Sequence, residues 1–169
     1  MPGLFGERAV QCKVVTPRQH LFKRQMVYTR HPEPDVPGVN HLSFEEVLAG
    51  CDYLTLHCPL TEQTRHLMDA AALGRLKPTA CIINTARGAL IDEKALIDAL
   101  QQGRLAGAGL DVQEEEPPCQ GSPLYDMPNV ILTPHMGWKG LETRRRLVEM
   151  TAENIRSYFA GAPIHIVNG

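Results

Sequence analysis

Short apolar runs alternate with amphipathic segments along most of the chain, and this alternation limits the folds open to it. Strands are expected at 26–29, 52–57, 79–85, 106–112 and 129–133, and helices at 41–50, within 69–77, at 91–103 and at 142–161. Strands that alternate with helices form right-handed βαβ units around a parallel sheet. The runs are apolar on both faces, as a sheet covered by helices requires. The sequence therefore predicts an α/β fold with a doubly wound parallel sheet.

Two of the expected helices carry recognisable start signals. Ser43 and Glu46 have the spacing of a capping box, in which each residue satisfies a backbone N–H of the other. Asp92 can cap the helix at 91–103, and Gly103 can end it. These signals support the helix assignments independently of the apolar pattern.

Residues 1–25 fit this pattern poorly, because basic residues, prolines and glycines are mixed there without a clear period. We expect an irregular leader over 1–25 that adds nothing to the core. The domain itself is expected over 26–169.

Composition excludes several classes of function. The net charge of −2 gives no reason to expect nucleic acid or an acidic membrane surface. No apolar run is long enough to span a bilayer, and no signal-peptide pattern follows Met1. The five cysteines form no CxxC pair, which indicates free thiols in a reducing, cytoplasmic compartment. No metal site is expected, since Cys51, His57 and Cys58 lack metal-ligand spacing.

Polar side chains follow three of the expected strands. Arg87 follows the third strand, Asp111 and an acidic run at 114–116 follow the fourth, and His135 follows the fifth. Ligands of open parallel sheets bind beyond the carboxyl ends of the strands, so these groups should share one edge. Any one of them alone is more often a solvated surface residue. Together they suit a 2-hydroxy or 2-oxo acid, because arginine binds carboxylates and a carboxylate-held histidine transfers protons, with a cofactor supplying hydride.

Three long motifs carry a resemblance to a known family: "INTARGALIDEKAL", "AGAGLDVQEEEPP" and "VILTPHMGW". In this order and spacing they resemble the D-isomer-specific 2-hydroxyacid dehydrogenases. The resemblance extends from Met26 to Gly169 and is greatest to glycerate dehydrogenases and hydroxypyruvate or glyoxylate reductases. It implies a Rossmann-type NAD(P)-binding domain, a small 2-oxo or 2-hydroxy acid as substrate, and a homodimer.

The resemblance also implies catalytic roles. Arg87 would bind the substrate carboxylate, His135 would be the general acid and base, and Glu116 would be its partner. Glu114 and Glu115 compete for the last role. Glu116 is preferred because the family's acid lies five residues after the strand-end aspartate, directly before a proline.

Further residues are implied to bind the cofactor. Asp111 would bind the nicotinamide carboxamide, and Gly137 would allow close approach beside His135. Besides these residues and Arg87, the implied cofactor contacts are Cys58, Pro59, Thr85 and Ala86.

The chain departs from the family pattern at the cofactor phosphates, since no G-x-G-x-x-G turn is present. That turn presents backbone N–H groups and a helix N-terminus to the pyrophosphate. The expectation is thus an incomplete, N-terminally truncated Rossmann-type sheet lacking the first βα unit. A non-catalytic fragment that folds and dimerises is the alternative, and a nucleotide-sensing binding protein is a third reading.

Cofactor choice has one signal. NAD-preferring proteins place an aspartate after the second strand for the ribose hydroxyls. Here Thr29 and Arg30 occupy that region, so no carboxylate would repel a 2′-phosphate and an arginine could pair with it. The sequence favours NADP(H) over NAD(H), with a solvated loop arginine as the alternative.

Overall fold

The computed structural model describes residues 10–14, 24–29, 39–118 and 120–166. Glu7–His135 and Met136–Gly169 belong to separate compact units, which are described in turn. The first unit contains the sheet and the second contains one long helix.

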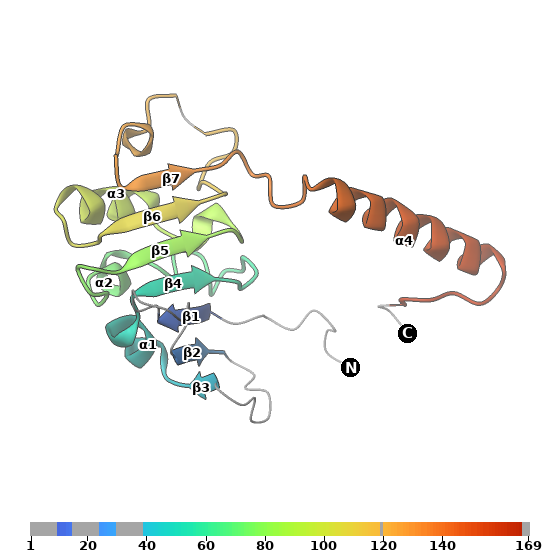
Figure 1. Ribbon diagram of the computed structural model, residues 1–169, viewed down its shortest axis with the longest axis horizontal. Helices are drawn as coiled ribbons and strands as arrows, with labels where there is room; N and C mark the ends of the chain where they lie inside the picture. Colours follow the sequence, from blue (N-terminus) through green and yellow to red (C-terminus); the bar gives the residue numbers. More distant parts are fainter. Residues whose placement is uncertain (1–9, 15–23, 30–38, 119, 167–169) are drawn as a thin grey trace. The chain divides into compact units, whose positions relative to one another are not determined.

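The first unit is built on a mixed sheet of seven strands in the order β3-β2-β1-β4-β5-β6-β7 (Figure 1). The strands are β1 (Val10–Val14), β2 (Arg24–Tyr28), β3 (Val39–His41), β4 (Tyr53–Leu56), β5 (Cys81–Asn84), β6 (Gly107–Leu110) and β7 (Val130–Leu132). Its helices are α1 (Phe44–Gly50), α2 (Ala70–Leu73), η1 (Gly88–Leu90), α3 (Glu93–Gln101) and η2 (Pro123–Tyr125), where η marks a 3₁₀ turn.

Strands β4 to β7 are parallel, as the sequence predicts. Their carboxyl ends therefore lie at one edge of the sheet, which we call the carboxyl edge. The α/β fold class is confirmed, and the predicted strands are found within a few residues of their expected bounds. The boundary differences are of the size expected where strands fray into loops.

Strand β1 corrects the expectation of an irregular leader at the start of the chain. The segment at 10–14 is a strand between β2 and β4, so residues 1–25 are not irregular throughout. Its sequence, VQCKV, alternates apolar and polar residues, which is the strand period. The slot beside β4 is therefore filled rather than left as an open edge.

The direction of β1 matters for the carboxyl edge. It runs antiparallel to both neighbours, and Val10 pairs with Leu56 on one side and Tyr28 on the other. The first residue of β1 thus lies at the carboxyl edge, and its last residue, Val14, lies at the opposite edge.

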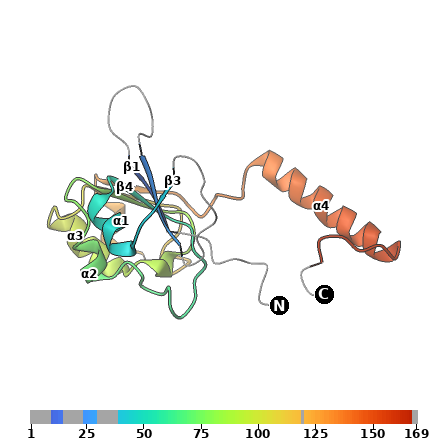
Figure 2. The same ribbon diagram turned by 90° about the horizontal axis from the view of Figure 1, so that it is seen from below.

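Helices α1, α2 and α3 cover one face of the sheet (Figures 1 and 2). Leu54, Leu56 and Ile82 point into this layer and are completely buried. On the opposite face Tyr53 is 37% exposed and Ile131 is 72% exposed. The second helix layer of a doubly wound sheet is not among the described residues of this unit.

The predicted helix caps are confirmed. Ser43 caps α1 in a complete capping box with Glu46, and the helix begins at Phe44 rather than at residue 41. Asp92 caps α3 by accepting a hydrogen bond from the Ala95 N–H at 3.0 Å. Residues 39–41 pair with β2 as strand β3 instead of opening the helix.

The second unit contains α4 (Leu141–Phe159), close to its expected bounds of 142–161. No residue of α4 is buried, and Leu147, Val148 and Phe159 are each more than half exposed. The Arg144 guanidinium lies 5.7 Å from the ring centroid of Trp138, within the range of a cation–π contact. Among the helices that the structure describes, none has the length and apolar character needed to cross a membrane.

Candidate active site

The residues singled out after the strands gather at the carboxyl edge. Arg87 follows β5, Asp111 follows β6 directly, and His135 follows β7. Since these three strands are parallel neighbours, the side chains are presented from adjacent positions along one edge. The predicted placement at a shared edge is confirmed.

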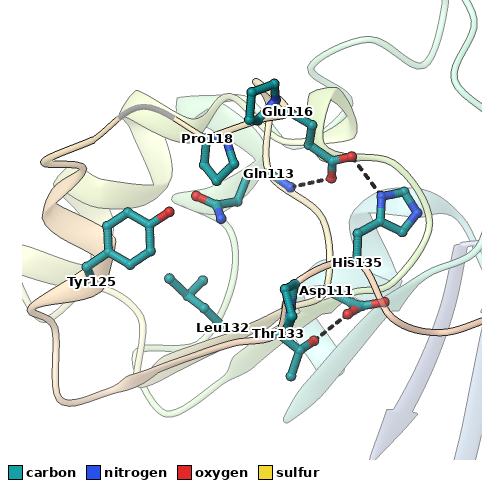
Figure 3. Close-up of a pocket in the computed structure, with 10 residues that line it drawn as sticks. Asp111, Gln113, Glu116, Pro118, Tyr125, Leu132, Thr133 and His135 are labelled. Carbon is teal, nitrogen blue, oxygen red and sulfur yellow. Dashed lines mark hydrogen bonds and ion pairs between the residues drawn. The ribbon is translucent and has the colours of Figure 1, made fainter. Parts of the chain in front are cut away.

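Glu116 and His135 form a direct pair and point toward one another (Figure 3). His135 Nδ1 lies 2.7 Å from Glu116 Oε2. The other carboxylate oxygen, Oε1, accepts a hydrogen bond from the Gln113 backbone N–H at 3.2 Å. His135 Nε2 has no hydrogen-bond partner in the described part of the chain, so one ring nitrogen is held while the other remains available to a ligand.

The backbone of His135 aims this ring. Its φ is 46°, in the left-handed region, which histidine tolerates better than most residues. The His135 N–H donates to the Thr133 carbonyl oxygen at 3.0 Å, closing a tight turn after β7. The turn brings the imidazole back toward the loop that carries Glu116.

Two of the three consecutive glutamates are distinguished by their contacts. Glu114 Oε1 lies 2.6 Å from His66 Nε2, and Glu114 Oε2 accepts from the Glu93 N–H at 3.1 Å. Glu114 therefore holds the loop, while Glu116 contacts His135. This geometry agrees with the choice of Glu116, whose catalytic role remains a prediction.

Arg87 stands on a turn held by a buried asparagine. Asn84 is 1% exposed; its Nδ2 donates to the Arg87 carbonyl at 2.8 Å and its Oδ1 accepts from the Ala86 N–H at 3.1 Å. The Arg87 guanidinium is exposed and donates to the Ala86 carbonyl at 2.7 Å. No carboxylate of the described residues forms an ion pair with it. The positive charge is therefore available to an anion.

Close packing connects the arginine turn to the acidic loop. A methyl group added at Gly88 would lie 1.8 Å from the Gln113 carbonyl oxygen and 2.5 Å from the Glu114 nitrogen. A residue with a side chain would collide with backbone there. Glycine at 88 therefore lets the Arg87 turn and the loop leading to Glu116 lie against each other.

Asp111 is held at the floor of the site. It is buried, its N–H donates to the Asn84 carbonyl at 3.0 Å, and one carboxylate oxygen accepts a hydrogen bond from the Thr133 hydroxyl. These contacts tie the ends of β5, β6 and β7 together. The carboxylate is thereby fixed beside the His135 turn.

A pocket of about 450 Å³ opens beside the Glu116–His135 pair (Figure 3). Its volume lies in the range of sites for small molecules. Apolar and polar side chains share the lining, and the buried Oε1 of Gln113 has no hydrogen-bond partner in the described residues. The lining residues are Asp111, Gln113, Glu116, Pro117, Pro118, Tyr125, Leu132, Thr133, Pro134 and His135.

The remaining predicted cofactor residues do not line the pocket beside Glu116 and His135. Cys58 is buried after β4, and the Pro59 carbonyl accepts a hydrogen bond from the Thr64 hydroxyl at 2.7 Å. After β5, Thr85 is exposed and Ala86 is half-buried. Gly137 belongs to the second unit, and Arg30 lies outside the described residues.

Three residues that line the site or contact its loops are not marked by the sequence pattern. Thr133 follows β7 directly, so the strand-end argument could have found it. Gln113 contacts Glu116 through its backbone N–H. Every residue except proline has this group, so the sequence does not single out Gln113. His66 belongs to no local sequence motif that would reveal its contact, because its partner Glu114 is far along the chain.

The described residues contain no group of three or more histidine, cysteine, aspartate or glutamate side chains arranged to hold a metal ion.

Comparison with known proteins defines the class of this domain. The sequence model described as "D-isomer specific 2-hydroxyacid dehydrogenase, NAD binding domain" matches residues 13–137, well over half of the chain. The chain belongs to this family, and its fold is the family's Rossmann-like NAD-binding domain. The match begins at residue 13, inside the segment for which no family likeness was expected.

Curated relatives are similar over most of this chain but over less of their own length. A glyoxylate reductase of Korarchaeum cryptofilum is 45% identical over 132 residues, which are 78% of this chain and 40% of that protein. A glycerate dehydrogenase of Methylorubrum extorquens is 35% identical over 98% of this chain and 52% of that protein. The chain thus spans about half the length of these relatives.

Solved structures give the same fold. A protein of Thermus thermophilus, TT0316, is 43% identical with a TM-score of 0.77, covering 83% of this chain and 46% of that one. A D-isomer specific 2-hydroxyacid dehydrogenase of Xanthobacter autotrophicus, in complex with NADPH and MES, is 39% identical with a TM-score of 0.72, covering 84% and 59%.

Proposed function

We propose that Arg87, Glu116 and His135 form the active site of an oxidoreductase that interconverts small 2-oxo and 2-hydroxy acids with NAD(P)(H). The proposed substrates are hydroxypyruvate, glyoxylate and D-glycerate. The observation that carries the proposal is the 2.7 Å Glu116–His135 pair at a pocket. The Arg87 guanidinium, without a carboxylate partner in the described residues, stands at the same edge.

Each side chain has a defined task in reduction. The Arg87 guanidinium binds the substrate carboxylate through paired charged hydrogen bonds. His135, protonated, donates its Nε2 proton to the carbonyl oxygen, and Glu116 stabilises the charged ring and fixes its orientation. NAD(P)H, when bound, supplies the hydride that reaches the carbonyl carbon. The product is the 2-hydroxy acid, and the neutral imidazole regains a proton from water.

Substrate and cofactor preference are proposed from separate observations. Relatives named glyoxylate reductase, glycerate dehydrogenase and hydroxypyruvate reductase support small, highly oxidised acids. NADP(H) is proposed because Thr29 and Arg30 stand where NAD-preferring proteins have an acid. Solved relatives include complexes with NADPH and with NAD, so the family accommodates both.

A second candidate is that these 169 residues alone bind the dinucleotide poorly and turn over slowly. The observation that favours it is the direction of β1, whose last residue, Val14, lies at the edge opposite Arg87. The glycine-rich turn of a dinucleotide site follows a parallel strand and meets the pyrophosphate at the carboxyl edge. No G-x-G-x-x-G occurs in the sequence, so Asp111 and Thr85 are proposed to face the nicotinamide half alone.

We further propose that the chain forms a homodimer. Support comes from α4, where Leu147, Val148, Tyr158 and Phe159 are each more than 60% exposed. Analytical ultracentrifugation of the purified chain tests this, and a monomer at micromolar concentration would contradict it.

The proposed chemistry is tested by coenzyme oxidation with hydroxypyruvate and glyoxylate. The purified chain is assayed beside a fusion that adds the part of a glyoxylate reductase relative that this chain does not match. We expect turnover by the fusion. Turnover by the 169 residues alone within about tenfold of a typical enzyme, near 10 s⁻¹, would contradict the second candidate.

In the fusion, Arg87→Gln tests the carboxylate site. Loss of hydrogen bonds to a charged group should raise the KM for hydroxypyruvate by roughly 10- to 100-fold, from about 1.5–3 kcal/mol per bond. Arg104→Gln is the matched control, since Arg104 is an exposed arginine that bonds the Gln102 side chain. Equal KM values in the two variants would remove Arg87 from substrate binding.

A further inference from the structure

His66 lies outside the proposed active site, yet its side chain contacts the loop that carries Glu116. Its Nε2 is 2.6 Å from Glu114 Oε1, and the two side chains are 38% and 28% exposed. The two residues are 48 positions apart in sequence. The contact therefore joins two segments that the chain connectivity leaves independent.

The backbone at His66 contacts the arginine turn as well. The His66 N–H donates to the Ala89 carbonyl at 2.8 Å, and the Met68 N–H donates to the Leu90 carbonyl at 3.0 Å. Ala89 and Leu90 belong to η1, for which Arg87 is the N-cap. The segment 66–68 therefore braces the turn from which the Arg87 side chain extends.

Glu114 links His66 to the loop that carries Glu116. It is locked to the start of α3, because its Oε2 accepts from the Glu93 N–H and its N–H donates to Glu93 Oε2 at 3.2 Å. The preceding residue, Gln113, donates its N–H to Glu116. Holding Glu114 thus fixes the backbone donor that orients the Glu116 carboxylate against His135.

We propose that His66 is a positioning residue that sets the Arg87 turn and the Glu116–His135 pair in one fixed geometry. It acts through its backbone bond to Ala89 and its side-chain bond to Glu114, and it does not touch the substrate. The inference rests on the proposed function, since it gives His66 a role in the same site. It predicts that removing the side-chain bond alters His135 at a distance.

His66→Asn is the appropriate variant. The φ of His66 is 51°, and asparagine is among the residues that tolerate this region, so the backbone contact with Ala89 is kept. The shorter side chain does not reach Glu114. His66→Gln is the conservative variant, because its longer amide restores a polar contact with the carboxylate.

The readout is the pair of ring-nitrogen signals of His135 in ¹H–¹⁵N spectra of the 169-residue protein, together with the Gln113 amide signal. Glu116→Gln calibrates the response, because it alters the direct partner of the ring. We expect His66→Asn to shift the His135 signals in the same direction as Glu116→Gln by a smaller amount. His66→Gln should return them toward wild type.

Glu62→Gln is the matched control, since Glu62 is an exposed carboxylate on the same segment as His66. It should leave the His135 signals unchanged. His135 signals that respond to Glu116→Gln but not to His66→Asn would overturn the proposal.

If His66→Asn does not fold, Glu114→Gln replaces it, because it keeps an oxygen acceptor for the Glu93 N–H and must give the same shift. None of these spectra needs turnover, so an inactive fusion would contradict the proposed function without deciding the role of His66.

Discussion

Gly88 and Gln113 approach so closely that a methyl group on the glycine would lie 1.8 Å from the Gln113 carbonyl oxygen. Backbone meets backbone at this point, and neither side can rotate away as a flexible side chain would. The contact joins the turn bearing Arg87 to the loop bearing Glu116. The proposed anion-binding residue and the proposed acid–base pair are thus linked through the main chain.

Gly88→Ala should therefore destabilise the protein. Overpacking a tight site costs on the order of 1–3 kcal/mol, and a backbone neighbour places the loss at the upper end. Urea denaturation measures it. Gly109→Ala is the control, because its methyl group would lie 3.8 Å from an Ile83 side-chain carbon, an ordinary contact. Matching denaturation midpoints for the two variants would mean that the 88–113 contact relaxes without cost.

Asn84→Ala should also lower the free energy of unfolding. It leaves the Ala86 N–H and the Arg87 carbonyl without the side chain that bonds both, and unsatisfied buried groups cost about 1–3 kcal/mol. Asn129→Ala serves as the comparison, since this exposed asparagine donates a single bond to the Ala106 carbonyl. A loss no greater than that of Asn129→Ala would show that solvent replaces Asn84.

Ser43→Ala should destabilise α1 in a pH-dependent way. Hydrogen bonds from the Ser43 side chain and backbone hold the pKa of Glu46 below its ordinary value. A carboxyl group with a lowered folded-state pKa adds stability above its unfolded pKa and loses it as the pH falls through the folded pKa. The difference between wild type and variant should thus be largest at neutral pH and shrink in acid. Denaturation at both pH values checks this, and a constant difference would exclude Glu46 from the effect.

His135→Ala in the active fusion should lower kcat by about 10²- to 10⁴-fold, the usual contribution of a general acid–base group. The dissociation constant of NADPH should change little, because the proposed task of His135 is proton transfer. His165→Ala is the control, since His165 contacts Asn154 in the second unit. A kcat equal to that of wild type at neutral pH would remove His135 from the chemistry.

Arg30→Asp should reverse or erase a preference of the fusion for NADPH over NADH. The arginine would pair with the 2′-phosphate, and an aspartate would repel it while accepting hydrogen bonds from the ribose hydroxyls. The ratio of kcat/KM for the two coenzymes measures the change. If the unaltered fusion uses NADH as well as or better than NADPH, Arg30 does not select the coenzyme and is only a solvated loop charge.

The parallel half of the sheet could be predicted because its strands are buried runs bounded by clear turns. The same alternation placed Arg87, Asp111 and His135 at one edge, since the direction of parallel strands fixes which ends meet. The Glu116–His135 pairing needed the family resemblance to choose among three glutamates. The structure supports the choice by engaging Glu114 with His66.

What escaped prediction depends on contacts between distant backbone segments. The strand at Val10–Val14 is short and lies among basic residues, prolines and glycines, so its period of two was overlooked. Its antiparallel direction is set by pairing with β2 and β4, which no local pattern encodes. The 88–113 contact and the bonds of Gln113 likewise pass through main-chain atoms.

The order of β5, β6 and β7 has a consequence for how such a site can change. Arg87 follows β5 and His135 follows β7, with one strand between them. Neighbouring strands are about 4.8 Å apart, so two spacings, set by main-chain hydrogen bonds, separate the ends of β5 and β7 whatever the side chains are. A molecule that contacts both Arg87 and His135 must bridge the gap between these two strand ends. Changes in the loops beyond the strands can therefore alter the pocket while the spacing of β5 and β7 stays the same.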